Sequence, residues 1–600
     1  MAEFKNPTQQ GGQDNKSFLV MALVMLMVFF GLKAYQSRHT PPVPPANQTA
    51  ASTATPAPAS PAAATAAASP TTSTAPIPAD TTPAVLAVVE STTIVENELY
   101  RIQFTNRGAQ VLSWQLKKYK DEEGKPLDLI HEQAAKKAGY PLSLYTQDAA
   151  LTTTLNQALY VPSATGILAS PSTLTFKYAG KGLVVTKTFS FDETYVLHAD
   201  ISVTNNGAPV RAFLSWPSGF GDLEDARSYA GAQIDSSTSG KVDHLAIKKI
   251  HTGTILNGPF DWAGVSDSYF AAVFLPDQPD TASLATFHDE IDVAKAKRNN
   301  DHASPSDKPV LMPVLGAALG DSSGHTLARV FVGPKAIAVL KAIHATDRNV
   351  TLEPILDFGF FGPIGKYLFV ALQFVQSHIS SNWGWSIVIL TIFINALLLP
   401  LRIKTMKSSI KMQRIQPQMD AIKARYKGLK ATDPKRGEMN AEVMELQKAN
   451  GVNMFGGCIP SLVQLPLLYA FLYMLPKIIE LRQAHWLWLP DLTIADPYRI
   501  LPIVMVVSQF LVQFYTPSPG VDPKQQKMMA FVMPLFSGYI CWTYSSGLAL
   551  YWVIGNLFSI ATQGVMNQTS LGREMREIAA KRARRKTQSP GKTQTIQGRR

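Results

Sequence analysis

The sequence has few cysteines and none of the residue patterns that usually carry catalysis. Its two cysteines, Cys458 and Cys541, both lie in apolar segments of the 600-residue chain. A disulfide framework is therefore unavailable, so any large exported domain must be stable through its own hydrophobic core. We find no phosphate-binding loop, metal-ligand cluster or paired nucleophile and base. We accordingly expect no enzymatic activity, no catalytic residue, no cofactor and no bound metal.

Acidic residues are missing from the long apolar segments of the C-terminal half. A helix needs about 20 residues to cross a bilayer, and five segments approach that length. Ion-coupled transporters usually need carboxylates inside the membrane as relays, so the absence of Asp and Glu favours a passive polar groove. The expected transmembrane spans are 383–402, 455–478, 499–516, 528–543 and 548–567.

The N-terminal half changes character three times. We expect a cytoplasmic N-terminus at 1–16 and an uncleaved apolar membrane anchor at 17–35. Pro, Ala, Thr and Ser dominate 36–90, which cannot bury enough apolar surface to fold and is expected to be a flexible linker. Apolar and polar residues then alternate between turn signals such as Asn106-Arg107-Gly108 and Asp192-Glu193. This pattern predicts a large antiparallel β-sandwich at 91–350, with hairpins around those turns. The fold class expected is therefore a polytopic α-helical membrane protein with a large β domain.

The remaining segments connect the spans. Helical periodicity around Asp433-Pro434 predicts a helical hairpin at 403–453, and mixed aromatic and polar residues predict an interfacial amphipathic helix at 355–379. The other expected segments are an outer loop at 479–498, a cytoplasmic loop at 517–527 and a basic cytoplasmic tail at 568–600.

Positive charge is concentrated in two of these segments. Arg402 to Lys448 contains 12 Lys and Arg against five Asp and Glu, and Arg573 to Arg600 contains ten against two. Six spans, including the anchor, place both termini on one side, which the positive-inside rule makes the cytoplasm. Residues 36–360 are then expected on the outer face. The basic segments suit anionic membrane lipid or RNA-rich partners, although positive-inside topology alone also explains them. We expect no DNA partner.

Polar side chains recur on one face of several spans. At 100° per residue, Thr391, Asn395 and Arg402 fall within about 40° of one another if the helix survives Pro400. Polar groups facing lipid would each cost a few kcal/mol, so they should face one another or water. A shared hydrated cavity is expected, with interhelical hydrogen bonding as the alternative that suits Gln464 and Gln513 better. The expected groove residues are Thr391, Asn395, Arg402, Gln509, Trp552, Asn556 and Ser559, with Gln563 on the same stripe as the last three.

Several longer segments together resemble one known family. They are LEPILDFGFFGPIGKYLF, NWGWSIVILTIF, MQRIQPQMDAIKARY, NMFGGCIPSLVQLPLLYAFLYML, ELRQAHWLWLPDL and DPKQQKMMAFVMPLFSGYICWTYSSGLALYWVIGNLFSIATQ. The chain resembles the YidC/Oxa/Alb family of bacterial membrane insertases, densely from Thr351 to Gln563 and more loosely through DWAGVSDSYFAAVFLP and VGPK. Its long β domain is similar to the periplasmic supersandwich of the Gram-negative members, which implies a location in the inner membrane.

The resemblance implies an activity and its partners. Family members act as insertases and chaperones that release hydrophobic segments of nascent integral membrane proteins into the bilayer, alone or with the Sec translocon. A groove open to cytoplasm and lipid receives the polar flank of the client. The ribosome is an implied partner, possible contacts being the 403–453 hairpin and the 573–600 tail.

The resemblance also implies roles for individual residues. Thr391 and Trp552 match groove-lining positions, and Leu465 and Leu468 match the surface along which a client slides. One position departs from the family, because Asn395 stands where most bacterial members carry an arginine. We hypothesise that Arg402 supplies the positive charge instead. Its alternative role is that of a cation reaching to the membrane interface.

Two other functions stay open on the sequence alone. A small-solute transporter or channel would need a pathway open to both sides, ideally with inverted repeats and buried ionisable groups. The β domain would alternatively be an envelope sugar-binding or sugar-modifying module tethered by the helices, but we find no convincing acid and base pair there.

Overall fold

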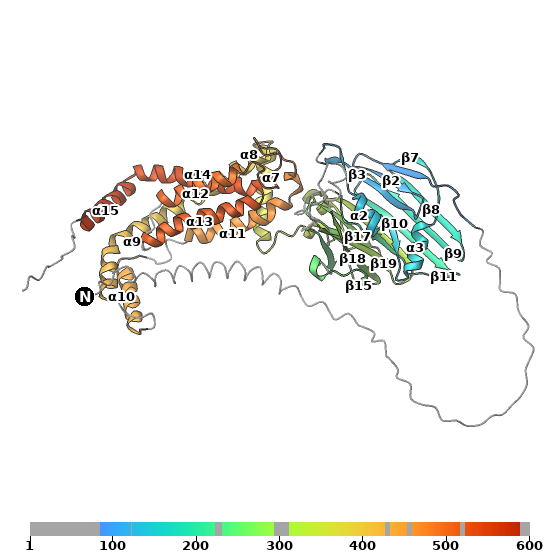
Figure 1. The fold of residues 1–600 in the computed structure, drawn as a ribbon, viewed down its shortest axis with the longest axis horizontal. Helices are drawn as coiled ribbons and strands as arrows, with labels where there is room; N and C mark the ends of the chain where they lie inside the picture. The colour runs from blue at the N-terminus through green and yellow to red at the C-terminus, as the bar shows by residue number, and fades with distance from the viewer. Residues whose placement is uncertain are drawn as a thin grey trace, which may run out of the picture. The chain divides into compact units, whose positions relative to one another are not determined.

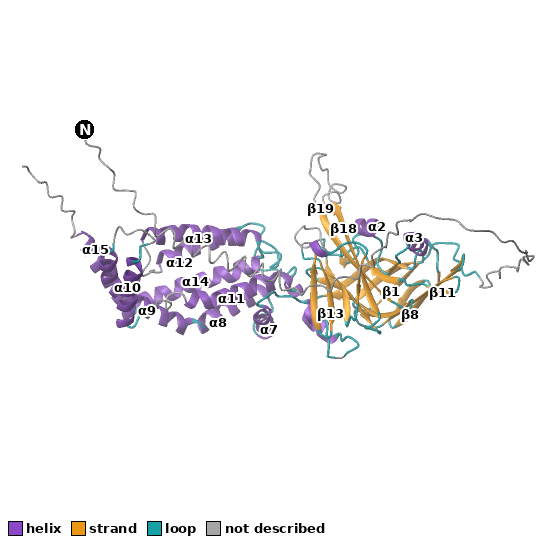
Figure 2. Cartoon of the chain, turned by 90° about the horizontal axis from the view of Figure 1, so that it is seen from below, coloured by secondary structure: helices purple, strands orange, loops and turns teal. Residues whose placement is uncertain are grey.

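The computed structural model describes residues 84–121, 123–221, 231–292, 311–347, 349–426, 433–452, 459–515 and 523–587. The chain divides into two compact units. Of the described residues, 84–356 form the β unit and 357–587 form the helical unit (Figures 1 and 2). The expected segments that lie wholly or mostly outside the described residues are 1–16, 17–35, 36–90 and 517–527, together with the end of the tail after 587.

Three sheets build the described part of the β unit. The largest sheet has ten strands. Its order is β14 (Lys241–Ala246), β13 (Gln233–Thr238), β16 (Trp262–Ser266), β17 (Phe270–Pro276), β20 (His325–Pro334), β10 (Val196–Asn205), β9 (Leu183–Phe191), β8 (Ser172–Gly180) and β6 (Val161–Pro162), with β11 (Ala208–Pro209) on β10. One five-stranded sheet has the order β4 (Pro126–Asp128), β3 (Gln110–Lys120), β2 (Tyr100–Thr105), β1 (Thr92–Glu96) and β7 (Gly166–Ala169), in which β1 and β7 pair in parallel. The other five-stranded sheet has the order β15 (Thr254–Asn257), β18 (Ala282–Asp292), β19 (Leu311–Asp321), β12 (Phe213–Trp216) and β5 (Ser143–Tyr145).

Alternation of side chains along the strands explains the core of this unit. On β9 every second residue is buried, and the residues between them are only partly buried. The ring centroids of Trp114 and Trp216 lie 5.6 Å apart in the interior. The hairpins expected around Asn106-Arg107-Gly108 and Asp192-Glu193 join β2 to β3 and β9 to β10. The expected β-sandwich architecture is thus confirmed, with strands that pair antiparallel except for β1 with β7.

One charged residue occupies a core position of β9. The ammonium of Lys187 is fully buried and donates to the carbonyl oxygens of Gly108, Ala109 and Leu142 at 3.0, 2.7 and 2.6 Å. Burial lowers the pKa of Lys187 to about 7, because desolvation disfavours the charged form. The three carbonyls come from segments distant in sequence, so Lys187 joins β9 to the 108–109 turn and the loop before β5.

Five short helices complete the described part of the β unit, and the last of them, η2, lies just before the end of the unit at Leu356. They are α2 (Glu132–Ala138), α3 (Ala149–Gln157), η1 (Ile247–Lys249), α6 (Ile337–Ala342) and η2 (Glu353–Ile355).

The helical unit contains apolar helices that pack against one another and three more polar helices, α9, α10 and α15. α12 packs on α13 and α14, α8 packs on α14, and α7 packs on α11 (Figure 1). The bounds are α7 (Gly362–His378), α8 (Trp383–Leu397), α9 (Leu399–Arg425), α10 (Lys435–Ala449), α11 (Ile459–Met474), η4 (Leu475–Lys477), η5 (Ile479–Leu481), α12 (Ile500–Tyr515), α13 (Pro523–Thr543), α14 (Ser546–Gln568) and α15 (Ser570–Thr587).

The described helices differ in whether they are long and apolar enough to cross a bilayer. α14 is long and apolar enough to span by itself, and α7 with α8 reaches that length only as a pair bent by 119°. The apolar segments Ile500–Phe514 and Met528–Thr543 are shorter. A span shorter than the hydrocarbon core is accommodated by local thinning of the bilayer.

The span expected at 383–402 is not one straight helix. α8 ends at Leu397, Leu398 caps both helices, and α9 begins at Leu399, with Pro400 within its first two positions. Proline has no N–H and its ring collides with the preceding turn, which explains the break. Arg402 therefore belongs to α9, which runs on to Arg425 as the first helix of the expected 403–453 hairpin. α10 forms the second helix after Pro434.

Candidate functional site

A partly buried polar cluster joins the apolar helices α8 and α14 to the start of the more polar α9. The guanidinium of Arg402 on α9 donates from Nη2 to Asn395 Oδ1 on α8 and from Nη1 to Ser559 Oγ on α14, both at 2.7 Å. Asn395 is only 1% exposed. We call Asn395, Arg402 and Ser559 the arginine cluster. The polar faces read from the sequence therefore meet at this point.

The local backbone explains why Asn395 points its oxygen at the arginine. Asn395 Nδ2 donates to the Thr391 carbonyl at 2.8 Å, and Thr391 Oγ1 donates to the Ile387 carbonyl at 2.6 Å. The amide donor is thus satisfied within α8, and Oδ1 stays available as an acceptor. Ser559 Oγ likewise donates to the Gly555 carbonyl at 2.7 Å, so its lone pairs can accept from Arg402.

Arg402 keeps hydrogen-bonding capacity beyond these two contacts. A guanidinium has five N–H donors, and in the described part of the chain the partners of Arg402 are two neutral oxygens rather than a carboxylate. The side chain is partly buried. Its positive charge is therefore held between apolar helices without neutralisation by an acidic side chain there, an arrangement suited to attracting an anionic group.

A second polar contact lies about one turn before Ser559 on α14. Asn556 Nδ2 donates to Ser508 Oγ of α12 at 3.0 Å, and both residues are buried. The sequence interpretation chose the neighbouring Gln509, which is partly buried, and missed Ser508. The periodicity contained the missing signal, because the buried residues Leu501, Met505 and Ser508 recur at i, i+4 and i+7 on one face of α12.

The other polar residues contact partners of different kinds. Gln464 Nε2 donates to the Tyr551 hydroxyl at 2.5 Å, the interhelical hydrogen bond favoured for Gln464 from the sequence. Gln563 donates to Asn567 within α14. Trp552 on α14 and Leu465 and Leu468 on α11 are partly buried. In the described residues no group of three or more His, Cys, Asp or Glu side chains is arranged to hold a metal ion.

Comparisons with known protein families match two regions of the chain, one in the helical unit and one that covers the β unit. The family described as 60Kd inner membrane protein matches residues 374–573, and the YidC periplasmic domain matches residues 92–371. The first match contains the whole arginine cluster, and the second contains the three sheets.

Individual relatives extend over most of the chain. The membrane protein insertase YidC of Ralstonia nicotianae is 31% identical over 498 residues, which are 81% of this chain and 85% of the relative. The protein of the same name from Cupriavidus pinatubonensis is 32% identical over 466 residues, 74% of this chain and 79% of the relative. A solved structure of an active YidC insertase with its first transmembrane domain resolved is 15% identical, covers 80% of this chain and 95% of its own, and has a TM-score of 0.32.

Proposed function

Because the chain belongs to the YidC family of membrane protein insertases, we propose that the arginine cluster receives the polar flank of a client protein during insertion. The family resemblance inferred from the sequence is confirmed, and with it the activity. The protein is an inner-membrane insertase whose substrates are nascent membrane proteins. Its activity is the transfer of a segment between environments rather than a chemical reaction.

The physical problem is the cost of moving polar groups into hydrocarbon. A charged residue at the centre of a bilayer costs roughly 2.5–3.5 kcal/mol on insertion scales. We propose that Arg402, Gln509, Trp552 and Ser559 line a hydrated groove that opens to the cytoplasm and to lipid. The buried residues Thr391, Asn395 and Asn556 would support its wall through their hydrogen bonds. Such a groove shortens the dry part of the path. The observation that carries the proposal is the bridge from Arg402 to Asn395 and Ser559.

The apolar part of the client needs a surface along which to leave. Leu465 and Leu468 on α11 are partly buried, and Phe531 and Leu535 on α13 are exposed. We propose that these two helices form the sliding surface. The short apolar length of α13 would thin the adjacent bilayer and reduce the distance that the client crosses.

We further propose six spans with both termini in the cytoplasm and the β unit in the periplasm. The α9–α10 hairpin then extends into the cytoplasm beside the basic α15, which contacts α9 through an ion pair between Arg414 and Glu574. This joint basic surface is proposed to contact the ribosome. The Sec translocon is proposed as a second partner for clients with large translocated domains.

Replacement of Arg402 tests the central step. Arg402→Ala should reduce insertion of a client with an acidic flank about tenfold, in line with the loss of one charge-assisted hydrogen bond. Insertion would be measured in reconstituted vesicles by protease protection, with a client whose flanking Asp residues are changed to Asn as the comparison.

Matched variants separate the role of the Arg402 charge in the cluster from the general effect of cytoplasmic positive charge on topology. Lys404→Ala removes an exposed cation one half-turn away and should leave insertion unchanged. Arg402→Lys keeps the charge but loses the paired donors, and should retain an intermediate rate. Equal insertion of the acidic client by wild type and Arg402→Ala would refute the role of Arg402.

A further inference from the structure

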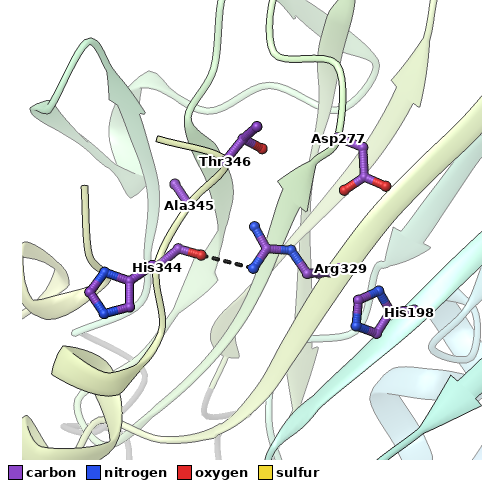
Figure 3. Close-up of a pocket in the computed structure, with 6 residues that line it drawn as sticks. All are labelled: His198, Asp277, Arg329, His344, Ala345 and Thr346. Carbon is purple, nitrogen blue, oxygen red and sulfur yellow. Dashed lines mark hydrogen bonds between the residues drawn. The ribbon is translucent and has the colours of Figure 1, made fainter. Parts of the chain in front are cut away.

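A cavity of about 690 Å³ lies on the β unit, outside the helical site. It is lined by His198, Asp277, Arg329, His344, Ala345 and Thr346 (Figure 3). We call it the β-unit pocket. His198 on β10 and Arg329 on β20 are directly opposed across the antiparallel pair. Their neighbours Leu197 and Ala199 are buried, so this pair projects from the face of the large sheet that is turned away from the core.

The side chains that line this pocket make few hydrogen bonds to the described residues. Arg329 is partly buried, and its Nη1 donates to the His344 carbonyl at 2.9 Å. Within the described residues this carbonyl is the partner of Arg329, and no carboxylate pairs with it. The side chains of His198 and Asp277 likewise make no hydrogen bond to the described residues. A cation with spare donors, an imidazole and a carboxylate therefore surround one open volume.

One wall of the pocket is the segment by which the chain leaves the β unit. Thr346 Oγ1 donates to the Pro276 carbonyl at 3.0 Å, and Ala345 N donates to the Val350 carbonyl at 2.8 Å. The segment from 344 to 351 closes on itself through a bridge between His344 and Thr351. It continues through η2 to Leu356, the last residue of the unit. Arg329 thus fastens this exit segment to the sheet.

We propose that the β-unit pocket binds a small molecule with a phosphate or carboxylate group and, beside it, hydroxyl or ammonium donors. Arg329 would bind the anionic group through its free donors, as guanidinium groups commonly do. His198 adds a second polar contact, and Asp277 accepts from the donors of the ligand. The volume lies within the range of small-molecule sites. A bound ligand that touches Arg329 and the 344–346 wall would also order the exit segment.

Calorimetric titration of the full chain in lipid nanodiscs tests this assignment. Glycerol 3-phosphate and glucuronate should bind saturably, whereas glycerol and glucose should not. Arg329→Gln should weaken binding about tenfold or more because it removes the charged donors, and Asp277→Asn should weaken it less. Arg101→Gln, at an exposed arginine of β2, is the matched control and should bind as wild type does.

Further readouts separate the parts of the proposal. Hydrogen exchange of residues 343–352 should slow when glycerol 3-phosphate is added, and should not slow in Arg329→Gln. Inorganic phosphate that bound as tightly as glycerol 3-phosphate would overturn the role of Asp277. Absence of saturable binding by either anionic probe, or binding that Arg329→Gln leaves intact, would overturn the site itself. If Arg329→Gln does not fold, His198→Gln and Asp277→Asn provide the same comparison at exposed positions.

Discussion

Each unit holds a cation away from bulk water, but the two cations are bound in different ways. Lys187 in the β unit is fully buried, and three backbone carbonyls accept from its ammonium. Arg402 in the helical unit is partly buried, and two side-chain oxygens accept from two of its five N–H donors. Lys187 has no donor left for a ligand. Arg402 does, so burial of a cation indicates a binding role only when its donors are not all used.

Removal of the lysine should give the largest effect on stability. Lys187→Ala leaves three carbonyl oxygens without their donor and a cavity in the core, so the β unit should lose roughly 3 kcal/mol or more of unfolding free energy. Pulse proteolysis of the full-length protein in urea would measure the loss. Lys187→Met, which keeps most of the volume, should lose less. Unchanged resistance in Lys187→Ala would mean that the ammonium is not a structural tie.

The pH dependence of the same residue should give a smaller effect. The folded-state pKa of about 7 lies below the usual value of 10.5. Between these values the unfolded chain binds more protons at Lys187 than the folded chain does, so this group makes the protein more stable as pH rises. The difference in unfolding free energy between wild type and Lys187→Met should grow from pH 7 to pH 9 by up to about 1.4 kcal/mol per pH unit. A difference that stays constant would show that burial does not lower this pKa.

Loss of the contacts that hold the arginine should act on insertion rather than on the fold. Asn395→Leu removes an acceptor of Arg402, keeps a similar volume, and should slow insertion of an acidic client about threefold to tenfold. The same variant should insert a client with a neutral flank at the wild-type rate. An equal loss for both clients would indicate damage to helix packing instead of a displaced guanidinium.

The smallest effect is expected where the polar contact lies away from the arginine. Ser508→Ala leaves Asn556 Nδ2 without its partner, and membrane contacts of this kind contribute about 0.6 kcal/mol. Insertion should therefore fall by no more than about threefold, for acidic and neutral clients alike. Selective loss with the acidic client would place Ser508 in the same functional set as Arg402.

Features of the molecule were predictable from the sequence when the residues that form them lie close together in the chain. The hairpins at 106–108 and 192–193, the hairpin at 403–453 and the shared face of Asn395 and Arg402 were predictable, because each depends on residues close in sequence. The prediction of that shared face was conditional on a helix that survives Pro400, and it did not include the transfer of Arg402 to a second helix. The two polar residues still face each other because the break leaves them on one side.

By itself the sequence determined the alternation of the strands, the apolar helices and the direction in which each polar stripe points from its own axis. Only the tertiary structure decided which stripes meet. It placed Ser508 rather than Gln509 against Asn556, put three distant carbonyls around Lys187, and fastened the exit segment to Arg329. Periodicity reports an orientation about a local axis, whereas a contact depends also on the position and rotation of a second element that a local pattern does not contain.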